Sequence, residues 1–184
     1  MRWNIATILK HLVPLPLYYA VREQVRNRVV PDEAGYALRY PDRQDVGRLA
    51  INDQAELHVF WKVLSRGCGP AFSLFVCGDE VLRLDCFGAG EGHYHTQFYC
   101  PDTPKRTRLH FFETTASTQV ERAMFEVTHN LDYYLQRHPR KCVRKTQMAP
   151  EILQSVCGQA EEIAKAYLAN VPELAELSPL KTHA

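Results

Sequence analysis

A glycine-rich segment that runs into a pair of histidines carries the clearest chemistry in this chain. It reads Gly88-Ala89-Gly90-Glu91-Gly92-His93-Tyr94-His95 and follows a predicted β-hairpin. Side chains two residues apart in a strand point to the same face. His93 and His95 are therefore expected to present two imidazoles together at the mouth of a loop. Such a pair suits metal ligation, proton transfer or contact with a phosphate.

Metal ligation is the first interpretation, and it needs a third ligand. The sequence offers His58, His110 or Glu91 for that place. In His-x-His metal sites of the cupin type a glutamate follows nearby, whereas here Thr96-Gln97-Phe98 follows the pair. The absence of a carboxylate on this strand makes a metal less attractive, and no cofactor is predicted.

Proton transfer is the second interpretation, because an imidazole with an ordinary pKa near ~6.5 exchanges protons at neutral pH. Arg83 and Asp85 lie on the preceding strand, where Arg83 would stabilise charge on phosphoryl oxygens and Asp85 would orient a histidine. The third interpretation is structural, with two half-exposed strand histidines bonded to nearby loops and a plain ion pair between Arg83 and Asp85. Phosphate handling by His93, His95, Asp85 and Arg83 is the sharper hypothesis, and a structural role stays open beside it.

The stretch from Phe72 to His95, FSLFVCGDEVLRLDCFGAGEGHYH, resembles the hairpin, glycine loop and His-x-His arrangement of TumE-type toxins of bacterial toxin–antitoxin systems and related uncharacterised proteins. The resemblance marks Asp85, His93 and His95. It implies a small bacterial protein with ribonuclease-like or nucleotidyl-transfer activity, with RNA or a cognate protein as partner. It does not account for the two ends of the chain. Two alternative functions stay open: a non-enzymatic binding protein of the antitoxin or immunity type, for which a homo-oligomer is considered, and a metal-binding protein.

Composition sets the frame for these hypotheses. A chain of 184 residues with 46% hydrophobic and 23% charged residues predicts one globular domain with its own core. A net charge of +1 favours neither nucleic acid nor a membrane as a partner. The six cysteines form no CxxC motif, so reduced thiols and a cytoplasmic location are expected. Lys10, Pro14 and Pro16 interrupt the apolar N-terminus, which is read as a short docking helix rather than a membrane anchor.

Hydrophobic periodicity predicts an α+β fold, an antiparallel β-meander with helices packed on one face. Residues 1–30 would form an N-terminal helical arm, 31–139 the α+β core, and 140–184 a basic linker and a C-terminal helix. Within the core, residues 31–47 are expected to be mainly loop and 66–70 a turn. Strands are expected at 55–64, 72–77, 80–87, 93–99 and 108–112, and helices at 115–138 and 150–170.

The hairpin between residues 72 and 87 is predicted to turn at Gly78-Asp79. In that register Val76 faces Val81. Phe75 and Leu82 would then share one face of the sheet, and Leu74 would lie with Arg83 on the other.

Overall fold

A computed structural model of the chain describes residues 41–64, 67–88, 90–96, 107–138 and 140–170. The predicted N-terminal arm (residues 1–30), most of the predicted loop at 31–47 and the far end of the predicted strand at 93–99 lie outside the described residues.

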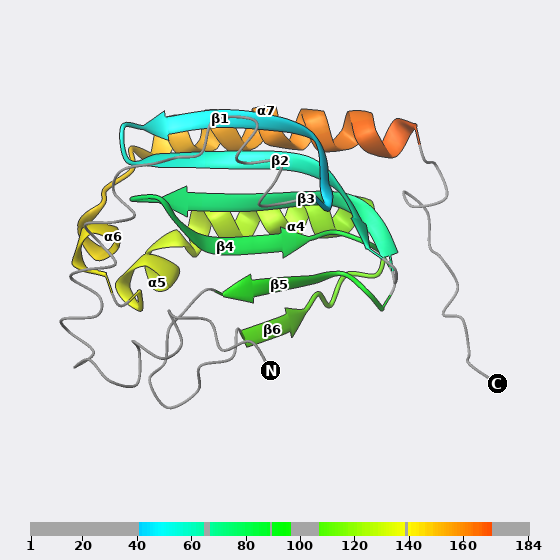
Figure 1. Ribbon diagram of the computed structural model, residues 1–184, viewed down its shortest axis with the longest axis horizontal. Coiled ribbons are helices and arrows are strands. Elements are labelled where there is room, and N and C mark those ends of the chain that lie inside the picture. Colours follow the sequence, from blue (N-terminus) through cyan, green and yellow to red (C-terminus); the bar gives the residue numbers. More distant parts are fainter. Residues whose placement is uncertain (1–40, 65–66, 89, 97–106, 139, 171–184) are drawn as a thin grey trace.

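The strands form one antiparallel sheet in which sequence neighbours are also spatial neighbours, in the order β1-β2-β3-β4-β5-β6 (Figure 1). Every described connection in this meander joins adjacent antiparallel strands, as expected for short linking segments. The predicted α+β class with an antiparallel sheet is confirmed. The strands are β1 (Arg43–Asn52), β2 (Ala55–Leu64), β3 (Gly67–Val76), β4 (Asp79–Asp85), β5 (His93–Thr96) and β6 (Thr107–His110).

Helices α4 (Ala116–His129) and α7 (Pro150–Ala169) lie side by side behind the sheet (Figure 1). The shorter helices α5 (Leu131–Gln136) and α6 (Lys141–Lys145) lie near the end of the sheet where β3 turns into β4 (Figure 1). Helix α4 begins where the Thr115 side chain accepts a hydrogen bond from the Thr118 amide. Helix α7 begins with Pro150, whose missing N–H costs nothing in the first turn. None of the helices among these residues is long and apolar enough to cross a membrane.

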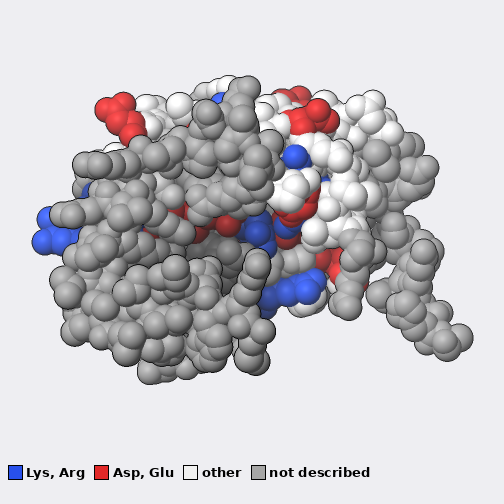
Figure 2. All heavy atoms as spheres, viewed as in Figure 1, with Lys and Arg blue, Asp and Glu red and all other residues white. Residues whose placement is uncertain are grey.

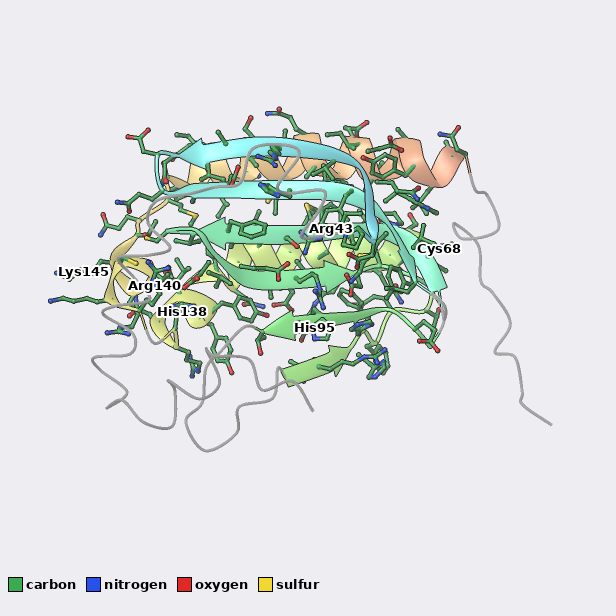
Figure 3. The ribbon with its side chains drawn as sticks, viewed as in Figure 1. Arg43, Cys68, His95, His138, Arg140 and Lys145 are labelled. Carbon is green, nitrogen blue, oxygen red and sulfur yellow. The ribbon has the colours of Figure 1, made fainter. Side chains whose placement is uncertain are left out.

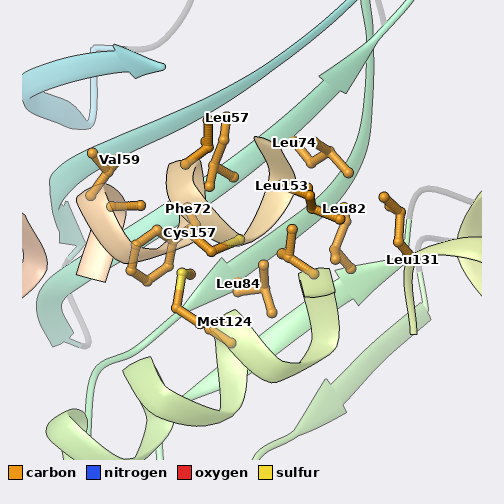
Figure 4. Packing of buried hydrophobic residues seen from close by; sticks show 14 of the residues in the cluster. Leu57, Val59, Phe72, Leu74, Leu82, Leu84, Met124, Leu131, Leu153 and Cys157 are labelled. Atoms are coloured by element: carbon orange, nitrogen blue, oxygen red, sulfur yellow. The ribbon is translucent and has the colours of Figure 1, made fainter. Parts of the chain in front are cut away.

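The hydrophobic core fills the space between the sheet and helices α4 and α7 (Figure 4). Leu57, Leu74 and Leu82 face one another across β2, β3 and β4, and so do Val59, Phe72 and Leu84. The two rows pack against apolar residues of the helices, among them Met124, Leu153 and Cys157. The core therefore lies on the face of the sheet that the helices cover, and the opposite face is not part of it.

The predicted register of the β3–β4 hairpin is wrong by one residue. The turn residues are Cys77 and Gly78, which both have positive φ (49° and 75°), and Val76 pairs with Asp79. Positive φ at both central residues matches the right-handed twist of the flanking strands. A register shift beside Val81 then sets Leu74 opposite Leu82. Because side chains alternate, this shift moves Leu74 to the core face and leaves Arg83 on the opposite face.

Four other boundaries differ from the predictions. The predicted helix over 115–138 is two helices, which meet at Asn130. The predicted basic linker contains helix α6. Strand β1 begins at Arg43, inside the predicted loop at 31–47, and the strand predicted to start at residue 72 begins at Gly67. The predicted turn at 66–70 therefore belongs largely to β3, where Pro70 pairs with Trp61 without breaking the strand.

Candidate functional site

Polar side chains run across the face of the sheet that the helices do not cover. Strand pairing sets Asp85 opposite His93, and His93 opposite His110. The neighbouring row sets Arg83 opposite His95, and His95 opposite Arg108. Directly opposed residues in antiparallel strands lie close enough for their side chains to interact. The meander thus gathers the residues that the sequence singled out, and Figure 3 labels His95 among them on β5.

Asp85, His93 and His95, which we call the His–Asp cluster, converge within a few ångströms. The Nε2 atoms of the two histidines lie 3.0 Å apart. Asp85 Oδ2 lies 3.3 Å from His93 Nε2 and 4.0 Å from His95 Nε2. Asp85 is fully buried and His93 is 5% exposed. These three residues are also a group, found among the described residues, whose ligand atoms are close enough to hold one metal ion.

Lys62 completes this site, and the sequence analysis did not assign it a role. Its Nζ donates hydrogen bonds to both carboxylate oxygens of Asp85, at 3.1 and 2.9 Å. Lys62 stands on β2, two strands away from Asp85, and it pairs with Gly69 on the intervening strand β3. A glycine is required there, because a Cβ on Gly69 would lie 2.5 Å from the Cys86 carbonyl oxygen. Burial lowers the pKa of Lys62, and the Asp85 carboxylate opposes that shift.

Two arginines add further positive charge around the cluster. Arg83 Nε lies 3.6 Å from Asp85 Oδ2, and an Arg108 guanidinium nitrogen lies 3.3 Å from His93 Nδ1. We call Lys62, Arg83 and Arg108 the cationic rim. The side chain of Arg108 is 43% exposed, so the site reaches solvent on the β6 side. In the space-filling view, basic and acidic atoms meet near the middle of this face of the molecule (Figure 2).

A backbone carbonyl fixes the protonation pattern of His93. Its Nδ1 lies 2.6 Å from the Glu91 carbonyl oxygen. A carbonyl only accepts hydrogen bonds, so Nδ1 carries the proton in this contact and Arg108 does not donate to it. In the neutral ring, Nε2 then holds a lone pair that is directed toward Asp85 and His95.

The glycine-rich loop is held from the helix layer by Gln119 on α4. The amide of Gln119 is bonded twice to Gly88, accepting from its N–H at 2.9 Å and donating to its carbonyl at 3.0 Å. It also donates to the Glu113 carbonyl at 2.8 Å. A side chain at position 92 would collide with it, because a Cβ on Gly92 would lie 2.0 Å from Gln119 Oε1. Gln119 thus fixes the approach of the chain to His93.

Burial keeps both imidazoles neutral near pH 7. Burial lowers the pKa of His93, although the Glu91 carbonyl and Asp85 oppose this. Burial, with Arg83 beside it, lowers the pKa of His95 to about 4. Within the part of the chain that the structure describes, two buried nitrogens of this site, His95 Nδ1 and Arg83 Nε, have no hydrogen-bond partner. Buried polar atoms are usually paired, so these two indicate unused binding capacity.

The structure brings together the four predicted site residues, Arg83, Asp85, His93 and His95. The expected exposure of the histidines was wrong for His93. His93 is buried rather than half-exposed. Of the third ligands considered from the sequence, His58 faces Glu56 at 3.0 Å, and the His110 ring centroid is 6.0 Å from that of His93. The carboxylate beside the histidines comes instead from Asp85. Lys62 and Gln119 carry no local signal, because strand pairing and the helix layer bring them in.

Comparison with known proteins identifies no relative of this chain. No family model matches the chain, and no curated protein or solved structure is significantly similar to it. The conclusions about function therefore rest on the residues and the geometry of the site.

Proposed function

We propose that this protein binds and processes phosphoesters, with RNA as the substrate class, at the His–Asp cluster. The observation that carries the proposal is the convergence of Lys62, Arg83 and Arg108 on two imidazoles and one carboxylate. Fixed cations beside groups that can activate an attacking oxygen are what phosphoryl transfer requires, because catalysis there is mostly positioning and charge stabilisation.

An unused donor in the site favours an anion. The three cations of the rim stand beside three carboxylates, those of Asp42 at 3.9 Å from Lys62, of Asp85, and of Glu91 at 3.8 Å from Arg108 in an exposed pair. Among the described residues, however, Arg83 Nε has no hydrogen-bond partner. A phosphate oxygen would accept from this donor, and guanidinium groups suit the geometry of phosphate.

The side chains of the His–Asp cluster are of the kinds that activate an attacking water or hydroxyl. Neutral imidazoles and a carboxylate do this either directly, as general bases, or by holding a cation that activates the oxygen. Lys62 holds both oxygens of Asp85, so it fixes the carboxylate against the two histidines. Arg83 and Arg108 would bind the phosphate and stabilise the charge that develops on it.

The test is cleavage of single-stranded RNA and of a chromogenic phosphodiester by the purified protein and by the Arg83→Gln variant. We expect Arg83→Gln to lower kcat by about 100-fold or more, the usual cost of one lost electrostatic donor. Its fold should persist, which circular dichroism would check, since the contact of Arg83 with Asp85 is a loose one of 3.6 Å.

Arg137→Gln is the matched control, because it removes one positive charge from α5, where Arg137 stacks over Tyr133 rather than facing the site. We expect it to cleave as the parent does. If neither substrate is bound or cleaved, or if Arg83→Gln and Arg137→Gln behave alike, the proposed function is wrong.

A second candidate is a protein-binding role, which three exposed aromatic side chains favour. Phe112 is 97% exposed, Tyr133 is 53% exposed and Phe125 is 44% exposed. Aromatic residues are enriched at protein interfaces. Light scattering of the parent and of a Phe112→Ser, Phe125→Ser variant would test self-association, and a monomeric parent would exclude a homo-oligomer.

A further inference from the structure

We propose that Asp85, His93 and His95 bind one divalent transition-metal ion, and that this ion and a bound phosphoester stabilise one another. The inference deepens the proposed function, on which it rests for the part played by the phosphoester. The metal-binding half stands on the geometry of three ligand atoms.

The spacing of these atoms matches a coordination sphere. Metal–nitrogen and metal–oxygen bonds of about 2.0–2.2 Å put neighbouring ligands about 3.0 Å apart at right angles and about 3.4 Å apart at tetrahedral angles. The corresponding separations here are 3.0 Å between the two Nε2 atoms and 3.3 Å between His93 Nε2 and Asp85 Oδ2. The third separation, between His95 Nε2 and Asp85 Oδ2, is 4.0 Å and would need a small closure.

The orientation of His93 is that of a ligand held by its outer contacts. Its Nδ1–H is bonded to the Glu91 carbonyl, which leaves the Nε2 lone pair for a cation. Metal-ligating histidines usually donate their second N–H to a carbonyl or carboxylate in this way. Gln119 strengthens the arrangement, since it ties the loop that carries Glu91 to helix α4.

Two imidazole nitrogens and one carboxylate oxygen select the class of metal. Imidazole suits zinc, iron, cobalt, nickel and copper, whereas calcium and magnesium prefer oxygen ligands. Three protein ligands also leave positions open for water or substrate, the usual arrangement of catalytic rather than structural metal sites.

The cationic rim makes the phosphoester part of the metal site. Lys62 Nζ is 2.9 Å from the same carboxylate oxygen that faces the histidines, and Arg83 Nε is 3.6 Å from it. These fixed charges weaken the binding of a dication that enters beside them, and an anion that joins the dication offsets part of this repulsion. Because coupling between two ligands is reciprocal, the phosphoester should raise the affinity for metal by the same factor by which metal raises the affinity for the phosphoester.

The direct test is titration of chelator-treated protein with Co²⁺ alone, followed by visible absorption and calorimetry. We expect saturation at one ion per chain, with d–d bands typical of nitrogen and oxygen ligands, and displacement by Zn²⁺. In the presence of phenyl phosphate we expect tighter Co²⁺ binding. No saturable binding overturns the site, and unchanged affinity with phenyl phosphate overturns the coupling.

Variants locate the ion. Asp85→Asn and His95→Ala should each weaken Co²⁺ binding by more than the about 10–100-fold that loss of an outer contact costs. The matched control is His110→Ala, which removes a neighbouring exposed imidazole on β6 and should bind as the parent does. Equal binding by Asp85→Asn and the parent would overturn the assignment.

Lys62→Met should raise the affinity for metal, whereas a poorly folded variant would lower it. Removing the ammonium group frees the Asp85 carboxylate and removes repulsion, so Co²⁺ should bind more tightly by about tenfold or more without phenyl phosphate. Unchanged or weaker binding would contradict the inference.

The outcomes separate this inference from the proposed function. Co²⁺ binding without cleavage of RNA by any metal-loaded form would leave the metal site standing and remove the proposed function. Cleavage by chelator-treated protein that binds no Co²⁺, with Arg83 still required, would do the reverse.

Discussion

Two buried carboxylates in this molecule have opposite surroundings. Glu126 on α4 is 2% exposed and accepts hydrogen bonds from Arg122, Asn130 and Tyr134. All three donors lie within eight residues of it along α4 and α5. Asp85 is fully buried, and its partners come from β2 and β5 as well as its own strand.

The difference lies in what each group leaves unused. Around Glu126 the donors and the carboxylate satisfy one another, and the junction of α4 and α5 is fixed. Around Asp85, His95 Nδ1 and Arg83 Nε remain without a hydrogen-bond partner among the described residues, and the Nε2 atoms of His93 and His95 lie 3.0 Å apart beside the carboxylate. A satisfied network serves the fold, while an unsatisfied one of this kind keeps capacity for a ligand.

The Lys62–Asp85 pair should show the largest effect. Asp85→Asn removes the hydrogen-bonded carboxylate of the buried Lys62 ammonium, leaves Asp42 at 3.9 Å, and should lower the free energy of unfolding by about 3–5 kcal/mol. Adding Lys62→Met removes the stranded charge and should restore most of that stability. Urea unfolding of the single and double variants measures this, and RNA cleavage should stay lost in both. A double variant no more stable than Asp85→Asn alone would contradict the account.

Glu126→Gln should damage stability and spare the site. The amide cannot accept from all the donors that Glu126 serves, so we expect a loss of about 1–3 kcal/mol in the free energy of unfolding. Binding of phosphoester and Co²⁺ at 25 °C should match the parent. A change in that binding would mean that the two carboxylates are coupled and that the contrast between them fails.

Gly92→Ala should disturb the loop between the two layers. Its Cβ would displace the Gln119 amide from its bonds to Gly88, at a cost of about 1–3 kcal/mol. RNA cleavage should fall as well, because the loop sets the position of His93. The matched control is Gly158→Ala on α7, where an added Cβ meets nothing within 4 Å. That change should raise stability by about 0.5–1 kcal/mol, the usual gain in a helix interior.

The smallest effect should come from pH. Burial raises the pKa of Glu126, but hydrogen bonds from Tyr134, Asn130 and Arg122 outweigh it and hold the pKa below the ordinary 4.5. The ionised form therefore stabilises the fold above about pH 4.5, and this contribution is lost as the pH falls through the lowered value. The gap in melting temperature between the parent and Glu126→Gln should narrow below pH 4.5. A constant gap down to pH 3 would contradict this assignment.

Local pattern was sufficient for the fold class and for most elements of the described chain. Alternation over residues 55–64 and the proline at position 150 are local signals, and strand β2 and helix α7 begin where they predicted. The register of the β3–β4 hairpin was harder to predict, because Cys77 is not a residue type that indicates a positive φ, which it nevertheless adopts. The register shift beside Val81, which no local pattern indicated, sets Leu74 on the face opposite Arg83, since the side chains of a strand alternate.

The sequence by itself determined that His93 and His95 would share one face of their strand, and that Arg83 and Asp85 would share one face of theirs, because i and i+2 positions of a strand are fixed by its geometry. The tertiary structure decided what surrounds them. Cross-strand pairing set Asp85 against His93, the sheet brought Lys62 to Asp85 from two strands away, and the helix layer supplied Gln119 to hold the loop. The contacts of Lys62 and Gln119 join residues far apart in the chain, so no spacing in the sequence encodes them.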